Sequence, residues 1–330
     1  MRKILFKGEE ITKKQALELI DEDCFNIQYM VNQPLAVTMK AIRENPCVLE
    51  FIEHKSEDMC LTAVKLEPAS LRYIDNPTEE MCLISVKEFG LYLYYIENQT
   101  YDICLQAVRN MGDALQYVKI QNHDICMEAV KSNGTSLQYV KDKTYDICLQ
   151  AVKTNGRALK YIKEQTHELC LEAIKTYGLG LKLIKDQTDD ICLYAVKNNG
   201  LALKYVKNKT EDIILDAIKN DGRALQYIKE QSELLCNEAV RSNGLALKFI
   251  KNPTMDMCLQ AVKQCYIALN YIEDQTEEMA LEGVKQHWRA LKYIKNPTEK
   301  VYVEAVKQNK ELLNGIEDIK LREKIRNMIS

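Results

Sequence analysis

The sequence has little of what catalysis, metal binding or membrane insertion requires. Its 330 residues include one tryptophan and four histidines (His54, His123, His167 and His287), and none of the histidines is paired with cysteine or carboxylate at ligand spacing. No apolar run approaches the roughly 18 residues of a membrane-spanning helix, and Ile4–Phe6 is too short for a signal-peptide core. We therefore expect a cytoplasmic, non-enzymatic protein without cofactor, metal, small-molecule substrate or membrane.

Charge of one sign is also lacking. The net charge is −3, which excludes a strongly basic protein that wraps nucleic acid through bulk charge. Residues 100–253 carry 22 basic and 19 acidic side chains, whereas residues 1–99 carry 11 and 17. The glycines do not form a phosphate-binding loop motif.

Cysteine, in contrast, is regular. Nine of the 12 cysteines recur at one phase of a 22-residue repeat: Cys60, Cys82, Cys104, Cys126, Cys148, Cys170, Cys192, Cys236 and Cys258. Helices of stacked repeats pack about 8–10 Å apart, which exceeds the Cα separation of about 7 Å that a disulfide tolerates. We predict reduced, buried cysteines that act as small hydrophobic residues at the seams between repeats.

The 22-residue register runs through nearly the whole chain without insertion. Taking Thr144 as position 1, fourteen units begin at Thr12, Pro34, Ser56, Thr78, Thr100, Asn122, Thr144, Thr166, Thr188, Thr210, Ser232, Thr254, Thr276 and Thr298. Such a period predicts an all-α solenoid of helix-turn-helix repeats. We expect an N-terminal cap segment at 1–11, a continuous array at 12–319 and a capping helix at 318–330.

Local signals predict two short helices in each unit, at positions 2–11 and 14–21. Position 1 is typical of an N-cap, and position 10 is usually Lys or Arg, which suits the end of a helix. Position 13 is glycine in consecutive units from Gly90 to Gly244, as expected for a left-handed residue just past a helix. No proline falls inside either predicted helix.

Position 18 is aromatic in twelve of the fourteen units, as in Tyr117, Tyr161 and Tyr227. One interpretation is a ladder of platforms on which the bases of single-stranded nucleic acid stack. The other is that the rings fill the space between second helices. Leu183 replaces the ring without disturbing the register, which favours packing.

The exposed positions of the second predicted helix, 14 and 17, supply a candidate interaction surface. Its residues in the central units are Arg157, Lys160, Leu179, Lys182, Leu201, Lys204, Arg223, Leu245 and Lys248. The lysines at position 20, for example Lys141 and Lys207, extend this into a basic ridge, although the dipole of a helix C-terminus also accounts for them.

The strings AVKNNGLALKYVKNKT (195–210) and AVRSNGLALKFIKNPT (239–254) resemble a short repeat of unknown function that is expanded in giant DNA viruses of the mimivirus group. The likeness covers roughly residues 56–309. It implies a viral origin, a host-cell cytoplasmic setting and interaction work. The predicted function is a scaffold for a host or viral protein partner, and the alternatives are single-stranded nucleic-acid binding and a structural role in the virion.

Overall fold

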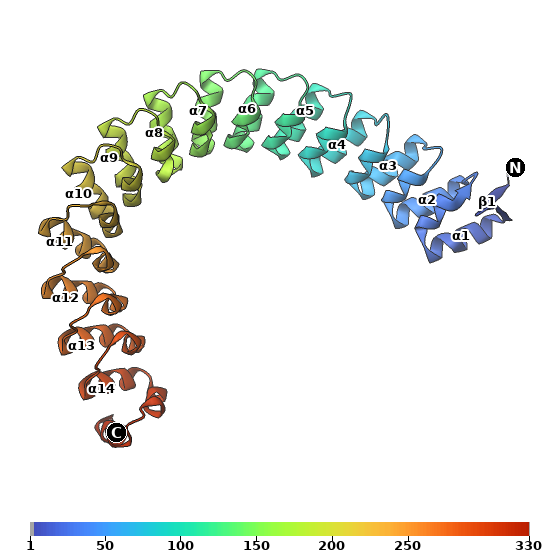
Figure 1. The fold of residues 1–330 in the computed structure, drawn as a ribbon. Coiled ribbons are helices and arrows are strands. Elements are labelled where there is room, and N and C mark those ends of the chain that lie inside the picture. The colour runs from blue at the N-terminus through green and yellow to red at the C-terminus, as the bar shows by residue number, and fades with distance from the viewer. Residues whose placement is uncertain (1–2, 330) are drawn as a thin grey trace. The chain divides into compact units, whose positions relative to one another are not determined.

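A computed structural model describes residues 3–329, so Met1, Arg2 and Ser330 of the predicted end segments lie outside the described residues. The protein is an all-α solenoid in which an α-helix alternates with a short 3-10 helix (Figure 1). The contacts of the chain divide it into two units, Met1–Glu164 and Gln165–Ser330. Within the described chain no helix has both the length and the apolar character needed to cross a bilayer.

The first unit has seven α-helices and seven 3-10 helices among its described residues. The α-helices are α1 (Lys13–Glu22), α2 (Leu35–Glu44), α3 (Glu57–Leu66), α4 (Glu79–Glu88), α5 (Tyr101–Asn110), α6 (His123–Ser132) and α7 (Tyr145–Thr154). The 3-10 helices are η1 (Cys24–Tyr29), η2 (Pro46–Phe51), η3 (Pro68–Tyr73), η4 (Gly90–Tyr95), η5 (Gly112–Tyr117), η6 (Gly134–Tyr139) and η7 (Gly156–Tyr161).

The second unit continues the same alternation and ends in one further α-helix. Its α-helices are α8 (His167–Thr176), α9 (Asp189–Asn198), α10 (Glu211–Asn220), α11 (Glu233–Ser242), α12 (Met255–Gln264), α13 (Glu277–Gln286), α14 (Glu299–Gln308) and α15 (Ile319–Ile329). Its 3-10 helices are η8 (Gly178–Leu183), η9 (Gly200–Tyr205), η10 (Gly222–Tyr227), η11 (Gly244–Phe249), η12 (Tyr266–Tyr271), η13 (Trp288–Tyr293) and η14 (Lys310–Gly315).

The α-helices lie where the capping pattern predicts them, at positions 2–11. The position-1 side chain accepts a hydrogen bond from the amide of position 4 in most units, as Thr100 does from Ile103. The prediction is wrong for Thr144, Thr188, Thr210 and Thr298, whose side chains accept no such bond. The hydroxyls of Thr144 and Thr188 donate instead to the carboxylate two residues on, Asp146 or Asp190, at 2.5 Å in each case.

The second helix differs from the prediction, because it is a six-residue 3-10 helix at positions 13–18. Its bonds join residues three apart, as in Ala158 N–H to the Asn155 carbonyl at 2.8 Å. Gly156, Leu159 and Ile162, also three apart, are all buried. A 3-10 helix has three residues per turn, so that spacing aligns them on one face. Positions 19–22 connect this 3-10 helix to the N-cap residue of the next repeat.

The glycine prediction is wrong in its reason. Among the described residues Gly8 is the glycine with a positive φ, so position 13 is not left-handed. A Cβ at Gly222 would lie 2.0 Å from the carbonyl oxygen of Ala239 in the next repeat. Glycine is therefore required at Gly222 by the close approach of the following α-helix.

The cap segment predicted at 1–11 contributes strands, which the sequence analysis did not predict. β1 (Ile4–Phe6) pairs antiparallel with β2 (Glu9–Ile11) and with β3 (Met30–Val31), the extended end of the first repeat. Lys7 and Gly8 join β1 to β2 with φ values of 51° and 91°, as a type I′ hairpin turn requires. The small sheet covers the open end of the first repeat.

At the other end, α15 covers the last repeat. Val306, Ile316 and Ile325 form a buried cluster, against which Leu313 and Leu321 pack. Asp318 precedes the helix, and its side chain accepts from the amides of Lys320 and Leu321 at 2.9 and 3.2 Å. The helix thereby buries an apolar face of the repeat that precedes it.

Candidate interaction surface

The nine predicted surface residues lie on the 3-10 helices, but not all in one unit. Arg157 and Lys160 lie on η7 in the first unit, and the other seven lie on η8 to η11 in the second. The cationic side chains are exposed. Leu179, Leu201 and Leu245, which we call the leucine row, are half-buried at position 14. Within the second unit, therefore, apolar and cationic side chains alternate along one series of helices.

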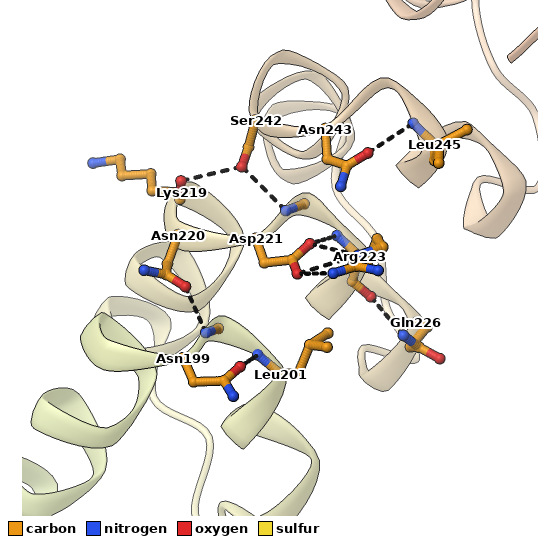
Figure 2. Close-up of polar contacts among 12 residues, drawn as sticks. Asn199, Leu201, Lys219, Asn220, Asp221, Arg223, Gln226, Ser242, Asn243 and Leu245 are labelled. Atoms are coloured by element: carbon orange, nitrogen blue, oxygen red, sulfur yellow. Dashed lines mark hydrogen bonds and ion pairs between the residues drawn. The ribbon is translucent and has the colours of Figure 1, made fainter. Parts of the chain in front are cut away.

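Arg223 does not contribute free positive charge. Its guanidinium holds Asp221 through Nε at 3.0 Å and Nη2 at 2.7 Å (Figure 2). Burial alone would raise the pKa of Asp221, but the hydrogen bonds from Arg223 outweigh it and hold that pKa below its ordinary value. The prediction of a basic ridge therefore fails at Arg223, because a bidentate pair compensates its charge.

The lysines at position 17 lie over aromatic rings. Lys160 Nζ lies 4.5 Å from the centroid of the Tyr161 ring, and Lys204 Nζ lies 5.6 Å from the centroid of the Tyr205 ring. Lys248 contacts Phe249 at 5.9 Å, and Lys182 contacts Tyr177 at 5.7 Å. These are cation–π distances. A ring covered by its own lysine is a poor platform for a nucleobase, which agrees with the packing interpretation of the position-18 rings.

The lysines at position 20 were attributed to a helix C-terminus, and this is wrong, because each 3-10 helix ends at position 18. Lys119 Nζ donates to the carbonyl of Glu97 at 2.8 Å, and Lys207 Nζ donates to that of Lys185 at 2.7 Å. In each case the acceptor is position 20 of the preceding repeat. These side chains connect successive repeats rather than forming a free row of cations.

Polar side chains at positions 11 and 12 fix the start of η9, η10 and η11 (Figure 2). Asn199 and Asn243 accept from the amides of Leu201 and Leu245, each at 3.0 Å. Ser242 accepts from the amide of Gly222 and donates to the carbonyl of Lys219, both at 3.1 Å. Leu201 and Leu245 of the leucine row are thus held at fixed backbone positions.

Sequence reasoning missed a glutamine at position 22 that joins repeats. Gln99 Nε2 donates to the carbonyl of Tyr117 at 2.9 Å, while its Oε1 accepts from the amide of Lys119 at 3.0 Å. The same pair of bonds is made by Gln33, Gln121, Gln187 and Gln275. The recurrence of glutamine as the last residue of a unit was the signal that could have revealed it.

The cysteine prediction is confirmed at the nine position-5 residues, which are buried and free. Cys104 is 4% exposed at the floor of a groove of about 530 Å³ that Tyr101 and Ile120 also line. Burial raises the pKa of this thiol. Burial, with Glu79 adding to it, raises the pKa of Cys82 to about 11. These thiols are protonated at neutral pH, which suits packing and not nucleophilic chemistry.

Among residues 3–329 no three His, Cys, Asp or Glu side chains are grouped so as to hold a metal ion. His123 and His167 instead contact Asp146 and Asp190 of the next repeat, with Nε2–Oδ2 distances of 3.2 and 3.0 Å. All four side chains are about half exposed. Such exposed contacts contribute little to stability.

Comparison with known proteins gives one family. A model described as a domain of unknown function (DUF4116) matches residues 100–145, 122–166 and 188–232, so each match spans about two 22-residue repeats. The matches together cover less than half of the chain. No curated protein matches it. No solved structure matches it.

Proposed function

We propose that the protein is a non-catalytic scaffold that binds a partner protein along the 3-10 helices of its second unit. The observation that supports this most is the leucine row, because half-buried apolar side chains are presented beside cations that are already engaged. Arg223 is paired with Asp221, and Lys204 and Lys248 lie over rings. A surface of this kind gains affinity from apolar burial rather than from phosphate contacts.

The alternative is single-stranded nucleic-acid binding through Lys182, Lys204 and Lys248, whose side chains are exposed. The affinity for nucleic acid should fall steeply between about 50 and 200 mM salt, because binding releases counterions from the phosphates and this release is less favourable at higher salt. A structural role in the virion is a third candidate, and self-association in light scattering would support it. The likeness to giant-virus repeats supports a viral origin and action in the host cytoplasm.

Two sets of substitutions distinguish the first two candidates, and both use residues that the repeat already tolerates. Replacing Leu179, Leu201 and Leu245 by threonine copies Thr135 at position 14, and replacing Lys182, Lys204 and Lys248 by glutamine copies Gln116 at position 17. We expect the threonine variant to lose, and the glutamine variant to keep, the protein retained by the immobilised full chain at 200 mM salt.

A gel shift with labelled single-stranded RNA at both salt concentrations is the companion measurement. Retention of RNA at 50 mM salt that the glutamine variant abolishes and the threonine variant preserves would favour the nucleic-acid alternative. Absence of any shift at 50 mM would eliminate that alternative.

A further inference from the structure

The first unit exposes a cluster of aromatic rings on η4 and η5. The rings belong to Phe89, Tyr92, Tyr94, Tyr95 and Tyr117, which we call the tyrosine surface. Tyr94, Tyr95 and Phe89 are 66%, 40% and 39% exposed. These are large exposed fractions for neighbouring aromatic side chains, and a contiguous exposed apolar surface marks an interaction site more often than isolated residues do.

The rings support one another and enclose no hollow. Tyr94 meets Tyr95 edge to face at 5.2 Å between centroids and meets Tyr117 at 5.3 Å. Phe89 meets Tyr92 at 5.1 Å in the same way. Close edge-to-face contacts leave no room between the rings for an enclosed ligand, so a partner must lie across their outer faces and edges.

In five other repeats of the described chain a cation at position 17 lies over an aromatic ring at position 18. In the preceding repeat the Arg72 guanidinium is 4.7 Å from the Tyr73 centroid, and Lys160 and Lys292 lie over Tyr161 and Tyr293. In η4 position 17 is Tyr94 itself. Within residues 3–329 no cation lies over the ring of Tyr94 or Tyr95, so these rings present faces that the chain covers with a cation in other repeats.

The repeats that carry this surface have a negative net charge. The three repeats centred on η4, residues 56–121, carry ten acidic and five basic side chains, a formal charge of −5. A negative potential attracts a cationic partner and repels a phosphate backbone. The negative charge of these repeats and the uncovered ring faces therefore both favour a cationic ligand.

We propose that the tyrosine surface binds an arginine-containing, positively charged segment of a partner protein. A planar guanidinium stacks on exposed tyrosine faces and is more weakly hydrated than an ammonium group, so arginine is favoured over lysine. This deepens the proposed function by giving the chemistry of one partner, and it uses residues distinct from the leucine row.

The test is fluorescence anisotropy of a labelled peptide of alternating arginine and glycine, titrated with the full chain at 50 and 150 mM salt. We expect saturable binding that is at least tenfold weaker in Tyr94→Gln/Tyr95→Leu. Both substitutions bring residues that stand at the same positions elsewhere, Gln116 and Leu183. A peptide of alternating lysine and glycine should bind several-fold more weakly than its arginine counterpart.

Tyr101→Gln is the matched control, because Tyr101 is 47% exposed but lies on α5, outside the tyrosine surface. It should bind the peptide as the unsubstituted chain does. If the double variant has a lower urea midpoint, Tyr94→Gln alone replaces it, with the same direction of effect expected. No saturable binding at 50 mM salt, equal binding by the variant, or equal affinity for both peptides would overturn the proposal.

Single-stranded RNA is a second probe, and RNA binding that the double variant abolishes would overturn the proposal in favour of a nucleic-acid partner. The leucine-to-threonine variant separates this proposal from the proposed function. It should leave peptide binding unchanged while abolishing partner retention. If the unsubstituted chain binds the peptide but retains no partner protein, only the scaffold role of the second unit is contradicted. If it retains a partner protein but does not bind the peptide, only this inference is contradicted.

Discussion

At position 13 a side chain of one hydrogen lets the backbone of one repeat lie against the next. An added Cβ would meet the alanine carbonyl of the following α-helix at 2.3 Å from Gly90 and at 2.0 Å from Gly222. Real Cβ atoms do not approach an oxygen so closely, so the helix would have to move. At Gly178 the closest atom is Asn199 Cβ at 3.2 Å, and less movement is needed.

Gly222→Ala should therefore destabilise the protein by about 1–3 kcal/mol, as overpacking of a close interior contact typically does. Gly178→Ala is the matched control and should cost markedly less. Urea unfolding followed by circular dichroism measures both. Equal midpoints for the two variants would contradict the contact with the Ala239 carbonyl as the reason for glycine.

Burial of the thiols at position 5 makes the stability of the protein depend on pH. The pKa of Cys82 is raised from its ordinary 9.0 to about 11, chiefly by burial. In the unfolded chain the thiol ionises above pH 9, whereas in the native state it stays neutral until about pH 11. The stabilisation of the native state by the neutral Cys82 thiol is therefore fully present below pH 9, and it is lost as the pH rises toward 11.

Cys82→Ala tests this linkage. Between pH 8 and 10.5 the unsubstituted protein should lose more stability than the variant, by up to about 2 kcal/mol. Urea midpoints in reducing buffer measure the difference, and lysine and tyrosine titrations cancel because both proteins share them. Parallel slopes would contradict a buried, protonated Cys82.

At the scale of the elements, position 22 holds adjacent repeats in register. Gln99 satisfies the carbonyl of the last residue of η5 and an amide just after that helix, two backbone groups that its absence would leave without these bonds. At Lys55, where lysine replaces glutamine, Nζ reaches the equivalent carbonyl of Tyr73 at 2.9 Å, whereas Lys143 and Lys209 donate within their own repeats. A lysine cannot accept a hydrogen bond, so it satisfies at most one of the two groups.

Gln99→Leu should cost about 1–3 kcal/mol, because it leaves part-buried backbone groups without a partner. Gln99→Lys should cost less. Gln116→Leu is the matched control, since the Gln116 amide donates only to the nearby Asp113 carbonyl on the exposed face. Hydrogen exchange should accelerate at the Lys119 amide in Gln99→Leu, and unchanged protection there would contradict the role of this side chain.

At the scale of the molecule, the α-helices within each unit pack on the elements of their own and neighbouring repeats, as in other solenoids. The ends therefore need separate covers. A hairpin adds to β3 at the start, and α15 buries Val306 and Ile316 at the end. Disruption of either cover should therefore destabilise mainly the repeat next to it.

Ile325→Ala should cost about 2–5 kcal/mol locally, because it opens a cavity in the terminal cluster. Hydrogen exchange should accelerate in α14 and α15 and stay unchanged in η9. Ile319→Ala, at a residue 66% exposed, should have little effect. Acceleration throughout the second unit would contradict nearest-neighbour coupling.

The phase of the repeat predicts where the residues of the candidate surface lie along the chain, but not which partners their side chains have. The leucines and lysines of η8 to η11 lie on one series of helices, as their common phase implied. The pairing of Arg223 with Asp221 and the cover of the rings by lysines depend on side-chain geometry that phase alone does not specify. The tyrosine surface has no signal in the period of the repeat, because Tyr94 is a single departure at position 17.

The sequence alone determined the repeat, the α-helix of each unit and the burial of the position-5 cysteines, because caps and a strict period are local signals. Only the tertiary structure decided that the second helix is 3-10, why position 13 is glycine, and which partners Gln99 and Lys119 have. Those features depend on atoms about one repeat away along the chain. Contact across a seam is set by packing, and no local pattern within a single unit encodes it.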